Sequence, residues 1–230
     1  MMDKATTDIN GKRLIMIGAG DLAREICGWF PNLNVGGFLD SHRRQWPEAG
    51  MPPIIGTPED YWPEPEDIFV CSVGNPAQRL AISRKLQARG AKFATLVHDS
   101  AELSATSSVG PGTIMLPFAL VDVNARVGDH CLLYFRAGVG HGATLGDGCI
   151  VLTNAVVGAR CVLGEGVVIS TLAFCNPGTS IGAFAQVGAN SFAARDVPPY
   201  ATAIGVPARI LAHRAEASNA VTGEPSEQPA

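Results

Sequence analysis

The sequence of 230 residues lacks an excess of basic residues, because 17 Lys and Arg stand against 21 Asp and Glu, for a net charge of −4. Without a basic surplus we do not expect general electrostatic binding of nucleic acid. The sequence also lacks an apolar run as long as a membrane span, and residues 1–12 are polar, unlike a signal peptide. We therefore expect a cytoplasmic protein that binds neither nucleic acids nor membranes.

Metal-binding cysteine pairs are absent as well. None of the six cysteines forms a CxxC pair, the spacing that would indicate a metal site. Four of them, Cys131, Cys149, Cys161 and Cys175, fall in the apolar and small positions of the repeat described next. We expect reduced cysteines with a packing role, as is usual in the cytoplasm.

The main positive feature is a period of six residues. Every sixth residue of the central segment is apolar: Leu103, Val109, Met115, Val121, Val127, Leu133, Val139, Leu145, Val151, Val157, Leu163, Ile169, Cys175, Ile181 and Val187. A small residue recurs two positions earlier, and a glycine such as Gly128 or Gly140 recurs one position later. A period of six fits neither a helix nor an alternating strand. It predicts a triangular β-solenoid with one short strand and one corner per hexad, and we expect the glycines to give the backbone freedom at the turns.

Three hexads should form one coil. The pairs Val109-Gly110, Val127-Gly128, Leu145-Gly146, Leu163-Gly164 and Ile181-Gly182 recur every 18 residues without an insertion. Residues 18 apart should therefore stack at the strand spacing of about 4.8 Å.

Ahead of the repeats, residues 13–17 read as a buried strand and residues 18–23 as GxGxxA, opening a helix to about Phe30. A strand at 35–39 follows and ends at Asp40. In this context Gly18, Gly20 and Asp40 predict a nucleotide site with phosphates near the helix N-terminus. Only roughly 95 residues precede the repeats, whereas a full dinucleotide fold needs roughly 150, so a mononucleotide or nucleotide sugar fits better. Alternatively, the glycines only let strand and helix pack tightly.

The rest of this half should hold a loop at 41–62 with a short turn near Pro58, a strand at 67–73, a helix at 76–89 and a fourth strand at 92–97. Asn75 and Arg79 stand where the third strand meets the second helix. They predict a second contact loop to the nucleotide, or an ordinary turn capped by Asn75.

Together the hexads and the Gly-rich segment resemble the hexapeptide-repeat sugar acetyltransferases with two domains, over residues 12–211. The resemblance implies a Rossmann-like half-domain for nucleotide sugars at 1–98 and a left-handed parallel β-helix at 99–197. It further implies a coenzyme-A-side segment at 198–212, and we expect a disordered tail at 213–230. The implied function is transfer of acetyl from acetyl-CoA, without a metal, to an amine or hydroxyl of a nucleotide-linked amino sugar, in a homotrimer.

The family uses a solenoid histidine as general base, and His141 aligns with it. The acid that usually follows this histidine is Gly142 here, and a further polar residue near the thioester is Ile150. By the 18-residue stacking rule, Asn124 lies beneath Gly142 and Asp122 beneath Gly140. We therefore expect Asn124 or Asp122 to hold the imidazole in place of the missing acid.

The resemblance assigns Gly158, Gly205, Pro207 and Arg209 to the coenzyme A side, with Arg209 facing the phosphates of the coenzyme. Because of Gly142 and Ile150, a non-catalytic trimer that binds sugar nucleotides remains an alternative. A nicotinamide-binding protein is a third, disfavoured by domain size.

Three acids, Asp129, Asp147 and Glu165, also stand 18 residues apart beside His130. Since like charges at strand spacing repel, we expect solvated turn residues and not a metal site.

Overall fold

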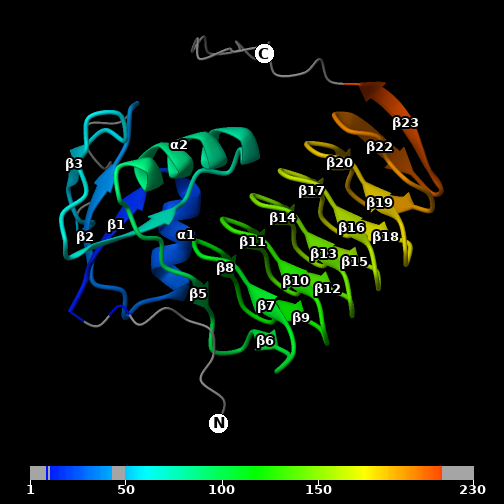
Figure 1. Cartoon of the computed structure of the whole chain (residues 1–230), viewed down its shortest axis with the longest axis horizontal. Helices are drawn as coiled ribbons and strands as arrows, with labels where there is room; N and C mark the ends of the chain where they lie inside the picture. Colours follow the sequence, from blue (N-terminus) through cyan, green and yellow to red (C-terminus); the bar gives the residue numbers. More distant parts are fainter. Residues whose placement is uncertain (1–8, 10, 43–49, 214–230) are drawn as a thin grey trace.

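The computed structural model of the chain describes residues 9, 11–42 and 50–213. The tail predicted to be disordered lies outside this range except for His213, which ends the last strand. The chain forms an α/β half followed by a stack of short coils that runs away from it (Figure 1). No helix in the described part is both long and apolar enough to cross a membrane.

The N-terminal half is a parallel sheet in the order β3-β2-β1-β4. Its elements are β1 Arg13–Ile17, α1 Asp21–Trp29, β2 Val35–Leu39, β3 Ile54–Gly56, β4 Asp67–Cys71 and α2 Pro76–Ala88. Alternate residues of β1 point to opposite faces of the sheet. Leu14 and Met16 share a core with α1, whereas Ile15 and Ile17 share one with Leu86 of α2. The sheet is therefore covered by one helix on each face.

Two sequence predictions for this half are corrected. The segment expected to be a loop contains β3, which pairs in parallel with β2 through Phe38 and Ile54. The fourth strand expected at 92–97 joins this sheet only through one bridge, between Phe69 and Phe93. The end of this segment, β5 Leu96–Val97, pairs instead with β8 Ile114–Met115 of the solenoid.

The predicted solenoid is confirmed as a parallel β-helix of three sheets, which fits a left-handed β-helix. Its two-residue strands are β6 Glu102–Leu103, β7 Ser108–Val109, β8 Ile114–Met115, β9 Leu120–Val121, β10 Arg126–Val127, β11 Leu132–Leu133, β12 Gly138–Val139, β13 Thr144–Leu145, β14 Ile150–Val151, β15 Val156–Val157, β16 Val162–Leu163, β17 Val168–Ile169, β18 Phe174–Cys175, β19 Ser180–Ile181, β20 Gln186–Val187 and β21 Phe192–Ala193. From β6 to β18 each strand pairs with the residues 18 positions later, as between Arg126 and Thr144 or Gly138 and Val156, whereas β20 pairs with residues 16 positions later in β22. The predicted coil length is therefore correct.

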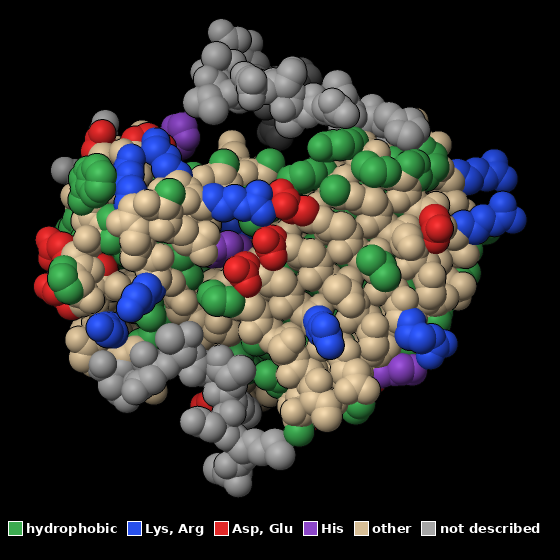
Figure 2. All heavy atoms as spheres, viewed as in Figure 1, with side chains coloured by type: hydrophobic (Ala, Val, Ile, Leu, Met, Phe, Trp, Pro, Cys, Tyr) green, Lys and Arg blue, Asp and Glu red, His purple; other side chains and the backbone are tan. Residues whose placement is uncertain are grey.

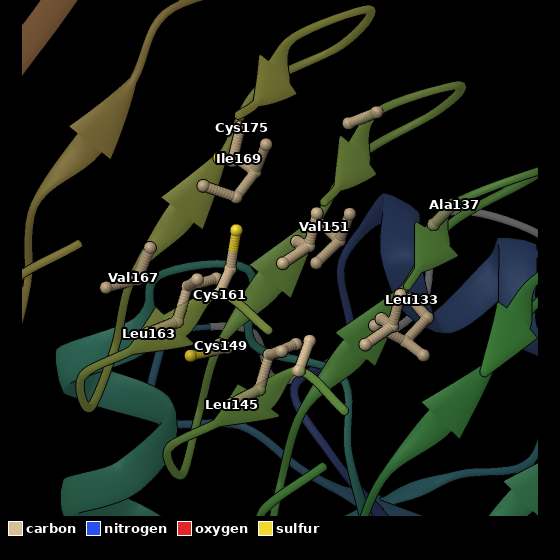
Figure 3. Close-up of a cluster of buried hydrophobic side chains, with 14 of the residues drawn as sticks. Leu133, Ala137, Leu145, Cys149, Val151, Cys161, Leu163, Val167, Ile169 and Cys175 are labelled. Atoms are coloured by element: carbon tan, nitrogen blue, oxygen red, sulfur yellow. The ribbon is translucent and has the colours of Figure 1, made fainter. Parts of the chain in front are cut away.

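The second residue of each strand fills the prism together with the small residues of the corners (Figure 3). Cys131, Cys149, Cys161 and Cys175 are all 0% exposed and unpaired, so packing accounts for them. Burial raises the pKa of Cys175 to about 12, which keeps this thiol protonated and unreactive.

The recurring glycines have a different role from the one expected. Gly128 and Gly140 do not have positive φ; instead, a Cβ on either would lie 2.8 Å from a backbone nitrogen of the next coil. The left-handed conformation falls two residues later, at a position occupied by Asn124 (φ 57°), Gly142 (φ 65°) and Arg160 (φ 55°), among others. Glycine is thus needed at Gly128 and Gly140 for close approach of the coils, whereas the left-handed position accepts glycine and larger residues alike.

The N-terminal half sits on the eight-stranded sheet, β23-β22-β20-β17-β14-β11-β8-β5. Outward side chains of its first coils, Ile114, Leu132 and Ile150, join the core formed by β1 and α1. Ile150 is only 4% exposed. The position at which the resemblance implies a polar residue therefore serves here to bind the two halves together.

Helix α2 adds a polar contact to the same junction. Arg84 donates to both carboxylate oxygens of Glu165, at 3.0 and 2.7 Å, and lies 3.5 Å from Asp147. Figure 2 shows basic and acidic side chains adjoining near the middle of this face. The hydrogen bond to Glu165 raises the pKa of Arg84, and the smaller opposing effect of burial does not cancel this rise. The charges of Asp147 and Glu165, expected from the sequence to be solvated turn residues, are thus partly neutralised by the N-terminal half.

The chain ends in a hairpin of β22 Ala201–Gly205 and β23 Ala208–His213. Strand β22 pairs with β20 and so extends the eight-stranded sheet.

Candidate active site

His141 lies on the corner between β12 of the six-stranded sheet and β13 of the five-stranded sheet. Its side chain is 56% exposed. Nδ1 lies 4.0 Å from Oδ2 of Asp122, and Nε2 lies 3.2 Å from Nη1 of Arg160. The imidazole is therefore held between a carboxylate and a guanidinium while its edge stays open to solvent.

Of the two residues expected to replace the missing acid, Asp122 is the one beside the ring. Its other oxygen, Oδ1, accepts a hydrogen bond of 2.7 Å from the backbone of Val123, which orients the carboxylate. Asn124 is exposed and is bound through its backbone to Thr106, with no contact to His141 recorded among the described residues. Its left-handed φ of 57° explains why asparagine stands there.

A pocket of about 310 Å³ opens on the six-stranded sheet next to this corner. Asp122 and Gly140 line the end nearest His141, and Phe118 and Arg136 line the other end. The Arg136 guanidinium lies 5.4 Å from the centre of the Phe118 ring. The pocket thus has an acidic end beside the imidazole and a cationic, aromatic end opposite.

The Gly-rich loop follows β1 as the motif predicts. Gly18 has φ 94°, and a Cβ there would lie 3.3 Å from Oγ of Ser72, so the close approach of this loop to β4 requires glycine. Gly20 caps α1 and has open space around it. The two Asp40 oxygens accept from the backbone of Ala19, at 2.7 Å, and of His42, at 2.8 Å. Asp40 therefore braces the loop from the carboxyl end of the sheet.

Of the two alternatives for the loop of Asn75 and Arg79, the structure has the turn capped by Asn75. Asn75 caps α2 by accepting from the backbone of Gln78 at 3.1 Å. Arg79 is 0% exposed, and its guanidinium donates to the carbonyls of Val73, at 2.9 Å, and His130, at 3.4 Å. Burial lowers the pKa of Arg79. In this structure Arg79 fixes α2 against the solenoid and is not open to a substrate.

Of the residues assigned to coenzyme A, Gly158 stacks on Gly140 in the next coil, on the corner of His141, whereas Gly205, Pro207 and Arg209 lie on the separate C-terminal hairpin. Gly158 lies where a Cβ would overlap the carbonyl oxygen of Cys175, so coil stacking already requires glycine there. Gly205 and Pro207 form the turn of the C-terminal hairpin, and Arg209 is exposed on β23.

The candidate residues therefore fall on different sides of one chain. The Gly-rich loop belongs to the half that covers the eight-stranded sheet, and the hairpin extends that sheet. His141 lies on the corner between the other two sheets. A triangular prism has that corner opposite the eight-stranded face, so a single chain does not bring its Gly-rich loop to its own His141.

No group of three or more His, Cys, Asp or Glu side chains that could hold a metal occurs in the described ranges. The reactive groups on hand are one imidazole, its carboxylate neighbour and two arginines, a set suited to proton transfer and to anionic substrates.

Comparison with solved structures gives close matches over most of the chain. The acetyltransferase domain of PglB from Neisseria gonorrhoeae FA1090 is 26% identical, with a TM-score of 0.80, over 87% of this chain and 100% of that one. The chain has the fold of the hexapeptide-repeat sugar acetyltransferases. The expected resemblance to this family is thereby confirmed.

Two further structures of these acetyltransferases contain ligands. The PglB domain in complex with acetyl coenzyme A is 28% identical, with a TM-score of 0.79, over 87% of this chain and 100% of that one. A histidine-to-asparagine variant of perosamine N-acetyltransferase from Caulobacter crescentus, in complex with CoA and GDP-perosamine, is 23% identical, with a TM-score of 0.79, over 87% and 97%. Neither a protein-family model nor a curated protein matches the sequence.

From the sequence, Arg126 and Arg160 are expected to flank the His141 face in adjacent coils and to meet a substrate phosphate or an acidic neighbour, whereas nothing in the sequence singles out Arg136 or Phe118. The stacking rule held the signal for Arg160, because it stands 18 residues after Gly142 and therefore above it.

Proposed function

We propose that the protein is an acetyl-CoA-dependent acetyltransferase that acts on an amine or hydroxyl of a nucleotide-linked amino sugar. The observation that carries this proposal is the exposed imidazole of His141, with a carboxylate behind it and a pocket of about 310 Å³ beside it. Imidazole is the side chain best suited to proton transfer at neutral pH. The acetyl coenzyme A complex of the PglB domain, at 28% identity, supports the acyl donor.

In the proposed reaction Nε2 of His141 takes the proton of the attacking amine or hydroxyl. The nucleophile bonds to the thioester carbonyl carbon, the C–S bond breaks, and the imidazolium returns its proton to the departing thiolate. The Asp122 carboxylate, 4.0 Å from Nδ1, stabilises the imidazolium. Its distance to the ring favours Asp122 over Asn124 for this role.

The N-terminal half is, in this proposal, a Rossmann-like domain that binds the nucleotide sugar. Gly18 and Gly20 shape the loop at the N-terminus of α1, where phosphates are favoured. Asp40 holds this loop through Ala19, and Asn75 lies at the start of α2 as a second candidate contact. The GDP-perosamine complex of the Caulobacter enzyme supports this substrate class.

Three chains would pack their prisms through the six-stranded sheet, β21-β18-β15-β12-β9-β6. Its outward side chains include Leu120, 42% exposed, Val156, 37% exposed, and Phe174, 38% exposed, with Phe118 at 58% on the adjoining corner. Such a contiguous apolar face marks an association site. Because His141 borders this face, a neighbouring chain would complete the site.

Coenzyme A would then lie in the groove between two prisms. Arg209 is exposed on the C-terminal hairpin and would meet phosphates of the coenzyme, with Gly205 and Pro207 shaping the turn. We place this trimer in the cytoplasm, in keeping with six unpaired cysteines.

The first experiment measures thiol release from acetyl-CoA over a panel of UDP-, GDP- and dTDP-amino sugars and free sialic acids. Release with one acceptor, lost in His141→Ala, would establish the reaction and its base together. Release that survives this substitution would refute His141 as the base. Coenzyme A binding without release from any acceptor would favour the non-catalytic trimer.

The second experiment tests the assembly by sedimentation. Phe174→Glu places a charge on the six-stranded face and should yield monomers. Val162→Glu is the matched control, since Val162 is 54% exposed on the five-stranded face. Equal effects of the two substitutions would refute the proposed interface.

A further inference from the structure

Arg160 approaches His141 from the next coil. Its backbone nitrogen donates to the carbonyl of His141 at 2.9 Å, and its Nη1 lies 3.2 Å from Nε2 of the ring. The side chain passes over Gly142, where a Cβ would lie 3.4 Å from Cγ of Arg160, at ordinary van der Waals distance. Arg160 therefore reaches the imidazole across the turn that follows His141.

The chemistry of this contact fixes the proton on the ring. A guanidinium has only donors, so the nitrogen that faces it must offer a lone pair. Nε2 is then unprotonated, and the proton of the neutral ring sits on Nδ1, on the side of the Asp122 carboxylate. At 4.0 Å this carboxylate is beyond hydrogen-bond distance. The contact from Arg160 is therefore the one that selects the tautomer.

We propose that Arg160 is a positioning residue that keeps neutral His141 in the Nδ1–H tautomer and yields its place at Nε2 to the acceptor's amine or hydroxyl. This inference rests on the proposed function, because the selected tautomer is the one whose Nε2 can take a proton. The transferred proton then lies on Nε2 until the coenzyme A thiolate receives it. The amide or ester bond forms as the thioester C–S bond breaks.

The resemblance stated in the sequence analysis implies an acid directly after the histidine, and here that position is Gly142. An acid acts on the Nδ1 side of a ring by accepting its proton, whereas Arg160 acts on the Nε2 side by donating. Both select the same tautomer. The chain thus compensates for the missing acid from the next coil.

The test reads the tautomer directly, by 15N chemical shifts of histidine ring nitrogens in the full chain at about pH 8.5, above the ordinary pKa of histidine. Five histidines contribute signals, and the loss of one set in His141→Asn assigns His141. We expect an unprotonated Nε2 in wild type and a shift of the proton toward Nε2 in Arg160→Met. Arg160→Lys, which also only donates, should restore the wild-type pattern.

Arg126→Met is the matched control, because Arg126 is exposed in a neighbouring coil with no contact to His141 recorded in the described ranges. It should leave the tautomer unchanged. In Arg160→Met, kcat should fall about tenfold while KM for the acceptor stays within about twofold, as for loss of the correct tautomer and not of binding.

A proton on Nε2 in wild type, or the same tautomer in Arg160→Met, would overturn the inference even if His141→Asn abolishes thiol release. Thiol release that survives His141→Asn would instead overturn the proposed base and this inference with it. The two failures are therefore distinguishable.

Discussion

The buried state of His130 predicts a stability that falls in acid. His130 is 2% exposed, and neither ring nitrogen has a hydrogen-bond partner among the described residues. The ring of Phe93 meets it edge-on, with centroids 4.6 Å apart. Burial, and next the charge of Arg79, lower the pKa of His130 from 6.5 to about 4, with a smaller opposing effect of Asp147.

The sign follows from the protons bound by each state. In the unfolded chain the imidazole takes a proton as pH falls through about 6.5, whereas in the folded chain it stays neutral down to about pH 4. The unfolded state therefore binds more protons over this range. As the pH is lowered, the free energy of unfolding decreases. At about 1.4 kcal/mol per pKa unit, the loss attributable to His130 is about 3 kcal/mol by pH 4.

The assay is urea unfolding of wild type and His130→Asn, at pH 7 and at pH 4, followed by circular dichroism. Asparagine does not titrate, and it tolerates the left-handed turn that His130 occupies at φ 55°. The titration of the carboxylates is common to both proteins and cancels in the comparison. Wild type should lose about 3 kcal/mol more than the variant between the two pH values. An equal loss in both proteins would refute a neutral, buried His130.

Three other predictions follow from the coils and the junction. Gly128→Ala should lower the free energy of unfolding by about 2 kcal/mol, because its Cβ would press on the next coil. Gly178→Asn, at an open turn position with φ 79°, should change it by less than about 0.5 kcal/mol. Equal effects of the two substitutions in urea unfolding would contradict this role of glycine. Asp122→Asn should lower the rate of thiol release more than Asn124→Gly, since only Asp122 faces the ring; the reverse order would reassign the acid's role. Arg84→Met should reduce stability by at most about 1 kcal/mol, and less in high salt, because the ion pair is half-exposed; a larger, salt-independent loss would mean that burial dominates there.

The solenoid could be predicted almost residue by residue. Once the interior position repeats every six residues, the coil length and the pairing follow, as the pairs Arg126–Thr144 and Leu132–Ile150 illustrate. The same rule placed Asp122 beneath the corner of His141, and the structure has its carboxylate 4.0 Å from the ring. A strict repeat is predictable because each residue's neighbours are fixed by sequence distance alone.

The six-residue period did not predict the separate roles of the glycines or the contacts between the two halves of the chain. Two different positions accept glycine, one for close coil contact, as at Gly128, and one for the left-handed turn, where Asn124 and Asn154 also stand. Residue type alone does not separate the two roles, because Asn176 stands at the first position. The contacts of Arg79 and Arg84 with the solenoid could not be predicted, because they depend on how the two halves pack and not on any period.

The packing of the halves also bears on how the proposed site is completed. Ile150 stands where the resemblance implies a polar residue near the thioester, yet it lies in the core between the solenoid and α1. The Gly-rich loop is on that same covered side, and His141 is on the opposite corner. Within one chain the sugar and its proposed base are therefore kept apart by the width of the prism. If the proposed reaction occurs, the sugar that reaches His141 must be held by a neighbouring chain, so a variant that is monomeric should keep the His141 geometry and still release no thiol.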